Sequence, residues 1–143
     1  MNRQDRVRAH LLESADVKRQ VLETCLAQIL AAADLIVGTF KIGGKMLLYG
    51  NSGSAADCQH LAAEFVSRLT NDFDRLDLPP IALTTDTSFL TAYANAVDFD
   101  GVFARQIQAL GKPGDVLVGI STSVNSLNVI RAIEIARQTN LKT

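Results

Sequence analysis

Apolar residues recur at three- and four-residue steps through residues 4–40, which is the spacing of one face of an α-helix. Packed helices are usually only about 8–20 residues long. We therefore expect a bend or short break within residues 16–26, and a helix stop at Gly43 and Gly44. The first half of this region has an apolar stripe with no sheet to cover, which predicts packing against another subunit. The repeating positions are Val7, Leu11, Leu12, Ala15, Val21, Leu22, Cys25, Leu26, Ile29, Leu30 and Ile36.

The rest of the chain repeats a strand–turn–helix pattern. Short apolar runs predict buried strands at residues 45–49, 81–84 and 115–120. Amphipathic segments predict helices at residues 55–69, from the N-cap Asp86 to about Tyr93, at residues 102–110 and at residues 127–139. A polar connector at residues 71–80 ends in two prolines. Strands that alternate with helices predict an α/β fold with a doubly wound parallel sheet.

The last residues, 141–143, have the pattern of the start of a further strand. A parallel sheet of three strands is small for this architecture, so we expect the C-terminal part of the fold to be missing. The sequence thus predicts one domain, with a helical region for oligomer packing at residues 1–43 and a truncated α/β core at residues 44–143.

Two polar turns join predicted strands to the helices that follow them. The first turn (residues 50–54) and the second turn (residues 121–126) hold glycine, asparagine and hydroxyl residues. In open α/β sheets ligands bind at such strand ends, where helix N-termini favour phosphate. Neither turn has a dinucleotide GxGxxG motif or a P-loop lysine, so a sugar phosphate fits better than a nucleoside triphosphate. Capped turns with no ligand are the alternative, but two of them at equivalent places favour binding.

His60 and Glu64 stand four residues apart in the helix predicted after the first turn, so both project from one face. This spacing suits two ligands of a divalent metal such as zinc, although a site needs at least one more ligand. Glu64 is also placed to abstract a proton beside a sugar carbonyl. An isolated pair of this kind is more often a hydrogen bond on the helix surface.

Net charge and hydropathy indicate where in the cell the protein works and which partners it does not attract. The formal net charge of −1 gives no field that attracts nucleic acid or an anionic membrane. The charged N-terminus does not match a signal peptide, and no apolar run approaches the roughly 20 residues that span a bilayer. We expect a cytoplasmic protein in which Cys25 and Cys58 are buried thiols within helices.

Two longer runs resemble the phosphoheptose isomerase version of the sugar isomerase (SIS) domain. One is GNSGSAADCQHLAAEFVSR at residues 50–68, where that family has GNGGS followed by a helix with His and Glu. The other, at residues 102–133, contains STSVNS where the family has STSGNS. The resemblance covers essentially the whole chain. It implies a flavodoxin-like fold and a homotetramer that interconverts sedoheptulose 7-phosphate and D-glycero-D-manno-heptose 7-phosphate for heptose biosynthesis.

The resemblance also implies roles for individual residues. His60 and Glu64 are expected to bind one zinc ion per subunit, and Glu64 to move the proton through an enediol intermediate. The remaining zinc ligands are expected from the absent C-terminal segment. The residues expected to bind the sugar phosphate are Asn51, Ser52, Gly53, Ser54, Glu64, Asn95, Ala96, Ser121, Thr122, Ser123 and Ser126.

Three positions depart from the family pattern. Ser52 and Val124 replace glycines, which is a mild change at Ser52 if φ stays negative but a poor fit at Val124 if φ is positive. Ala96 replaces an Asp that contacts the sugar. Because half of the expected zinc site is also missing, we expect this chain to be weakly active or inactive. The alternative is a non-catalytic SIS protein that binds a sugar phosphate or a protein partner, as a related regulator of replication initiation does. The regulator branch generally lacks the Glu, so Glu64 favours the isomerase.

Overall fold

The computed structural model describes residues 1–68 and 75–143, which form two compact units, Met1–Leu35 and Ile36–Thr143. Helix α1 (Arg3–Thr24) begins at the N-cap Asn2, whose side chain accepts a hydrogen bond from the Asp5 amide. Helix α2 (Leu26–Lys41) follows after a break at Cys25, so the predicted interruption is confirmed. The prediction for Cys25 itself was wrong, because it lies in the break and is only partly buried.

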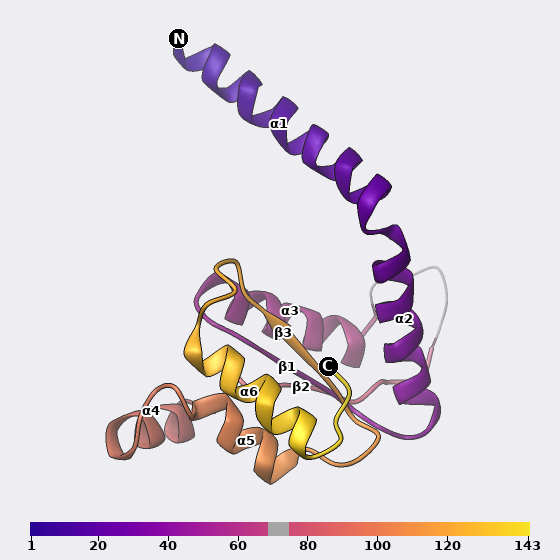
Figure 1. Cartoon of the computed structure of the whole chain (residues 1–143), viewed down its shortest axis with the longest axis vertical. Coiled ribbons are helices and arrows are strands. Elements are labelled where there is room, and N and C mark those ends of the chain that lie inside the picture. The colour runs from indigo at the N-terminus through magenta and orange to yellow at the C-terminus, as the bar shows by residue number, and fades with distance from the viewer. Residues whose placement is uncertain (69–74) are drawn as a thin grey trace. The chain divides into compact units, whose positions relative to one another are not determined.

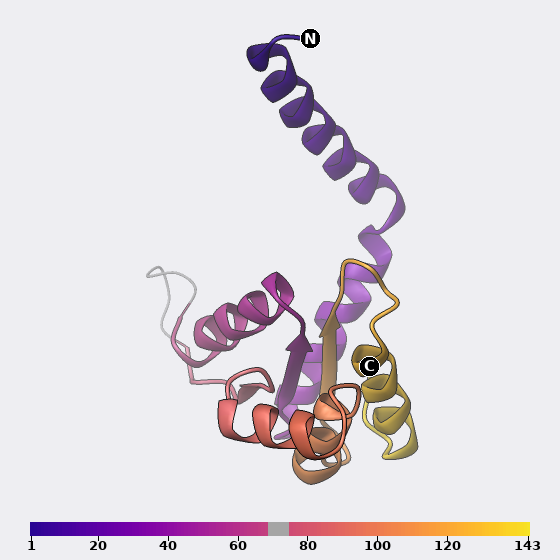
Figure 2. The same ribbon diagram turned by 90° about the vertical axis from the view of Figure 1, so that its left-hand side faces the viewer.

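The second unit is the predicted α/β fold with a parallel sheet in the strand order β2-β1-β3. Helix α3 packs on one face of the sheet, and α5 and α6 pack together on the other (Figures 1 and 2). The elements after α2 are β1 (Met46–Gly50), α3 (Gly53–Val66), β2 (Pro80–Ala82), α4 (Thr87–Ala96), α5 (Val102–Leu110), β3 (Val116–Ile120) and α6 (Leu127–Gln138).

Several predicted boundaries shift by one to three residues. Helix α3 begins at Gly53, because its first turn includes polar residues that were assigned to the preceding turn, and it ends at Val66. The predicted end of this helix at Leu69, and residues 71–74 of the connector, lie outside the described residues. Pro80 opens β2, an edge strand, where a missing N–H is tolerated. Lys142 forms a parallel bridge with Val116, as expected for the start of a further strand.

The core of this unit lies between the sheet and helices α5 and α6. Leu47 and Tyr49 stand on the same side of β1 and join Phe103 of α5 and Val129 of α6 in one buried cluster. The Tyr49 and Phe103 rings lie 5.2 Å apart, in a favourable tilted arrangement. Gly119 makes room for this packing, since a Cβ there would lie 2.5 Å from the Tyr49 hydroxyl oxygen. This core fixes β1 and β3 under the helix that follows the second turn.

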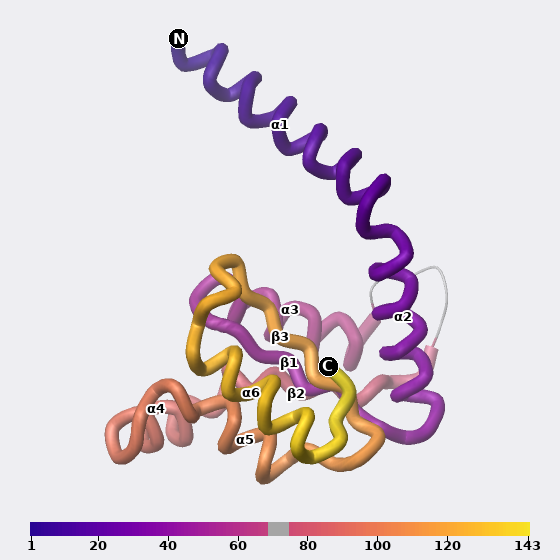
Figure 3. Tube along the Cα trace, viewed as in Figure 1, coloured from indigo at the N-terminus to yellow at the C-terminus, as the bar shows by residue number. Residues whose placement is uncertain are grey.

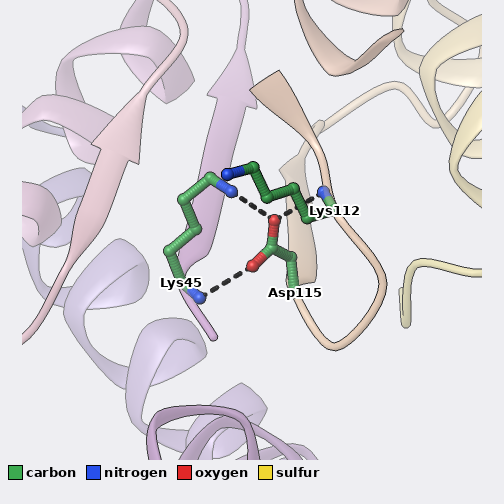
Figure 4. Close-up of polar contacts among 3 residues, drawn as sticks. All are labelled: Lys45, Lys112 and Asp115. Carbon is green, nitrogen blue, oxygen red and sulfur yellow. Dashed lines mark hydrogen bonds and ion pairs between the residues drawn. The ribbon is translucent and has the colours of Figure 1, made fainter. Parts of the chain in front are cut away.

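The amino ends of β1 and β3 are joined by the buried carboxylate of Asp115 (Figure 4). Its Oδ1 accepts from the Lys45 backbone N–H at 2.9 Å, and its Oδ2 accepts from the Lys112 backbone N–H at 2.7 Å and from the Lys45 ammonium. Burial alone would raise the pKa of Asp115, but these bonds hold that pKa below its ordinary value. This end of the sheet is therefore closed by matched charges and hydrogen bonds.

Among the described residues, no single helix is long and apolar enough to cross a membrane. In the part of the chain that the structure describes, one bent pair of helices, α1 and α2 taken together across the break between them, reaches that length and composition.

Candidate functional site

The two turns leave adjacent strands at the same end of the sheet. Gly50 of β1 pairs in parallel register with Ile120 of β3, so Asn51 and Ser121 follow paired residues. The chain trace shows both connections at this end (Figure 3). The approach is close at Gly50, where a Cβ would lie 2.6 Å from the Ile120 carbonyl oxygen and 2.9 Å from the Ser54 Cβ. The register thus brings the two turns side by side.

The helices that begin at these turns have N-termini without a side-chain cap. Ser52 precedes α3 and Ser126 precedes α6, yet neither side chain accepts a capping hydrogen bond. By contrast, Asn2 caps α1 and Asp86 caps α4 through their side chains. First-turn N–H groups without an intrahelical partner bind anions well, aided by the helix dipole. The two helices that begin after an uncapped serine, α3 and α6, therefore start beside each other at the carboxyl ends of β1 and β3.

The hydroxyls of the second turn bond to groups within the turn itself. The Ser121 hydroxyl accepts from the Val124 backbone N–H at 3.2 Å, and the Ser123 and Ser126 hydroxyls lie 3.3 Å apart. Thr122 and Ser123 are exposed, whereas Ser54 of the facing helix is buried. Hydroxyl rotors donate as well as accept, so these groups can turn toward a phosphate without a change in the backbone.

Both family glycines that this chain lacks fall at strained backbone positions. Ser52 and Val124 each have φ of +53°, a region that disfavours residues with a Cβ. The condition under which Ser52 would be a mild change is therefore not met. Val124 is the less favourable of the two, because branching at Cβ adds to the strain. The turns keep a glycine-like backbone although glycine is absent.

His60 and Glu64 stand together on α3, the helix that leaves the first turn. The His60 Nε2 lies 3.9 Å from the Glu64 Oε1, with 74% and 29% of their side chains exposed. An imidazole and a carboxylate suit zinc by donor chemistry, and neither is enclosed in the apolar core. Within residues 1–68 and 75–143, however, no three His, Cys, Asp or Glu side chains gather into a metal-binding group. The pair fits two positions of a zinc site and does not complete it.

The C-terminal end of α3 is held by Arg75. Its guanidinium donates to the backbone carbonyl of Glu64 at 2.6 Å and to that of Phe65 at 2.8 Å. A cation that bonds the last carbonyls of a helix satisfies unpaired acceptors and complements the dipole. The helix that carries His60 and Glu64 is thus anchored at the end away from the first turn.

Two of the expected substrate-binding residues stand on another helix. Asn95 and Ala96 are exposed at the end of α4, the helix that packs against α5. In the described part of the chain, no hydrogen bond joins either residue to the first or second turn. A sugar held by the two turns receives no side-chain amide or carboxylate from Ala96.

Near the carboxyl ends of the strands the structure also shows polar contacts that were not predicted from the sequence. Asn128, at the start of α6, pairs with Asn51, and Gln59 of α3 bonds the hydroxyl of Thr84 at 3.1 Å just beyond β2. A signal for Asn128 was present, because it stands one helical turn before the buried Ala132, where the helix pattern calls for an apolar residue. Nothing in the sequence alone marked Gln59.

Known proteins share this arrangement. Residues 10–143 match the family described as the SIS domain. The chain belongs to the SIS domain family. Its curated relatives include the phosphoheptose isomerase of Roseiflexus sp., 55% identical over 130 residues, and that of Thermodesulfovibrio yellowstonii, 46% identical over 143 residues. These matches place the chain in the phosphoheptose isomerase branch of the family.

Solved structures of phosphoheptose isomerases have the same fold as this chain. The phosphoheptose isomerase of Neisseria gonorrhoeae superposes with a TM-score of 0.90 at 45% identity, and that of Francisella tularensis with 0.92 at 32% identity. The superposed region is 98% of this chain and 72% of the Neisseria chain in the first case, and 99% of this chain and 73% of the Francisella chain in the second. The chain spans 65% of the Roseiflexus protein and 70% of the Thermodesulfovibrio protein, while 91% and 100% of this chain is matched. The SIS fold of the chain is therefore shared with longer proteins.

Proposed function

We propose that this SIS domain protein is an aldose–ketose isomerase that interconverts sedoheptulose 7-phosphate and D-glycero-D-manno-heptose 7-phosphate. The observation that carries the proposal is the side-by-side placement of two uncapped, hydroxyl-rich turns, with a carboxylate on the helix that leaves one of them. The names of the relatives at about half identity support the choice of sugar.

The phosphate binds between the two turns in this proposal. The first-turn N–H groups of α3 and α6 and the hydroxyls of Ser121, Thr122, Ser123 and Ser126 donate to its oxygens. Asn51, Ser52 and Gly53 line the sugar, with Ser54 beside them on the phosphate side. A net charge of −1 makes these local donors, rather than the global field, responsible for holding the dianion.

Glu64 is the proposed acid–base group. Its carboxylate removes a proton from C1 of the ketose while O2 takes a proton from solvent, which gives an enediol across C1 and C2. Return of that proton to C2, with loss of the O1 proton to solvent, gives the aldose. The Glu64 side chain is partly buried, and the Arg75 guanidinium donates to the Glu64 backbone carbonyl. These contacts keep the carboxylate on the face of α3 that it shares with His60.

Zinc enters the proposal through His60 and Glu64 as two of its ligands, with the others supplied from outside the 143 residues. When bound, zinc would polarise the oxygens on C1 and C2 and lower the cost of the enediol. Each subunit is proposed to hold one such ion and to work in the cytoplasm, where phosphorylated sugars are used.

We also propose that the protein assembles as a homotetramer through its N-terminal helices. Helix α1 buries none of its own residues and exposes Val7, Leu11, Leu12 and Leu22. An exposed apolar stripe of this length is typical of a helix that packs in an oligomer.

The test follows the proton that Glu64 is proposed to move. In a longer form of the protein that carries the remaining zinc ligands, with zinc supplied in D₂O, sedoheptulose 7-phosphate should gain deuterium at C1, detected by NMR, as the heptose aldose accumulates. Glu64→Gln should lower both rates by at least about a hundredfold and keep sugar-phosphate binding. Equal deuterium gain in this variant would remove Glu64 from the mechanism.

The non-catalytic alternative is favoured by one observation, the strained non-glycine residues Ser52 and Val124 in the two turns. It predicts that the sugar phosphate binds without any deuterium gain, even in the variant that restores both glycines and places Asp at Ala96. Turnover by that restored variant supports the isomerase.

A further inference from the structure

Asn51 and Asn128 form a reciprocal pair of side-chain amides across the site. The Asn51 Nδ2 donates to the Asn128 Oδ1 at 3.0 Å, and the Asn128 Nδ2 donates to the Asn51 Oδ1 at 2.9 Å. Asn51 lies in the first turn, and Asn128 lies in the first helical turn after the second turn. Seventy-seven positions separate the two residues in sequence, so the pair is a direct tether between two distant segments.

Asn128 is buried among apolar neighbours. Only 3% of it is exposed, and Ala132 and Ala136, which follow on the same face of α6, are fully buried. A buried amide raises the free energy of the folded state unless it is hydrogen-bonded. The pair satisfies one donor and one acceptor on each side chain. Asn51 is only partly buried and keeps its second N–H and second acceptor lone pair for other partners.

A second hydrogen bond holds the same turn of α6 and differs in one respect. The Tyr49 hydroxyl donates to the Val129 backbone carbonyl at 3.2 Å. Tyr49 of β1 and Asn51 of the first turn are two residues apart, so this short segment bonds the start of α6 twice. The Tyr49 bond lies wholly in the core, however, whereas the amide pair ends on a residue of the first turn.

We propose that Asn128 is a positioning residue for sugar-phosphate binding. Its amide fixes the amide plane of Asn51 and holds the first turn against the second, so that one ligand can be bound by both. Because Asn128 is buried, it acts through Asn51 rather than by touching the ligand. This inference rests on the proposed function of the two turns. Preorganisation of this kind raises affinity by lowering the entropy lost on binding.

Two matched substitutions separate positioning from stability. Asn128→Leu removes the amide pair between the first turn and the start of α6, and Tyr49→Phe removes the hydrogen bond between β1 and the start of α6. By calorimetric titration, Asn128→Leu should weaken sedoheptulose 7-phosphate binding about tenfold, and Tyr49→Phe should change it less than about twofold. Hydrogen exchange of unliganded protein should be faster at residues 52–54 in Asn128→Leu only. Equal affinity in Asn128→Leu and wild type, or an equal loss in both variants, would overturn the proposal.

A third variant supplies a signature that a loss of packing cannot imitate. In Asn128→Asp, the protonated carboxyl reproduces the paired geometry, with one donor and one acceptor, whereas the ionised form repels the Asn51 Oδ1. Affinity relative to wild type at the same pH should therefore recover as the pH falls. A relative affinity that is flat or falls with acid would contradict the positioning role.

The titration of the wild-type chain separates this inference from the function it rests on. Binding by wild type with no effect of Asn128→Leu rejects the inference alone. Absence of binding by wild type rejects the proposed function, and the exchange result then makes Asn128 a structural tether, which also overturns its positioning role.

Discussion

The two ends of strands β1 and β3 are built in opposite ways. At the amino end, one buried carboxylate, Asp115, joins both strands through three donors (Figure 4). At the carboxyl end, α3 and α6 start without side-chain caps. The positive φ values also differ, since Gly43, Gly114 and Asn140, which tolerate them, take them near the amino end, whereas Ser52 and Val124 take them near the carboxyl end. At the amino end of these strands the polar groups are hydrogen-bonded to one another, whereas at the carboxyl end the helix N-termini keep N–H groups without a side-chain partner.

This difference indicates which end stabilises and which end binds. A saturated polar network lowers the free energy of the folded state and leaves little for a ligand to gain. Open helix starts and non-glycine residues at positive φ raise that free energy, and such features collect at functional sites. Substitutions at the two ends should therefore separate stability from ligand affinity.

The largest effect on stability is expected at the amino end. Asp115→Ala should lower the free energy of unfolding by about 3 kcal/mol, because it leaves the partly buried Lys45 ammonium and two backbone donors without their acceptor. Arg131→Ala removes only half-exposed ion pairs, with Asp98 and Asp100, and should cost less than about 1 kcal/mol. Urea unfolding measures both. Retained sugar-phosphate affinity in a folded Asp115→Ala variant would sharpen the contrast, and a tenfold loss would break it.

At the carboxyl end the expected effect is on affinity. Ser126→Ala should weaken sugar-phosphate binding about tenfold and change stability by less than about 0.5 kcal/mol, because its side chain caps nothing. The control is Asp86→Ala, which removes the cap of α4 and should cost about 1 kcal/mol with no change in affinity. Titration calorimetry and urea unfolding on both variants check the pattern, and the opposite pattern contradicts the assignment of the binding end.

Relief of backbone strain should have a smaller effect on stability, and the effect should be stabilising, which is unusual for a substitution. Val124→Gly should raise the free energy of unfolding by about 0.5–1 kcal/mol, because relief of positive φ outweighs the greater freedom of glycine in the unfolded chain. Val97→Gly is a matched control, since Val97 is also exposed but has φ of −127°. It should be neutral or destabilising in the same urea experiment. Destabilisation by Val124→Gly would show that the positive φ is not a strained state.

The smallest expected effect is the acid dependence of stability from Asp115. Its pKa is lowered in the folded state, so the stabilisation is complete above the ordinary pKa of about 4 and is lost as pH falls toward the lower folded value. In Asp115→Asn this part of the pH dependence should vanish. Urea titrations at several acidic pH values would detect it, and an unchanged slope in the variant would assign the dependence to other carboxylates.

The sequence predicted more of the fold than of the site. Apolar periodicity located the helices and strands, including α5 at its observed bounds, because burial imposes the pattern directly. The pairing of Gly50 with Ile120 is a tertiary register, and the Asn51–Asn128 bond joins two side chains that no local pattern connects. Positive φ at Ser52 is also set by the surrounding structure, and the serine itself gave no sign of it. Asp115 was read as part of a strand, whereas its importance comes from Lys45, 70 residues away.

One titration tests the central account most directly, that the open end of β1 and β3 binds a sugar phosphate. Sedoheptulose 7-phosphate is added to ¹⁵N-labelled protein while backbone amide shifts are followed by NMR. The account predicts saturable shifts in both turns, residues 50–54 and 121–126, with residues 112–116 unmoved. Saturable shifts centred on residues 112–116, or none in either turn, would contradict it.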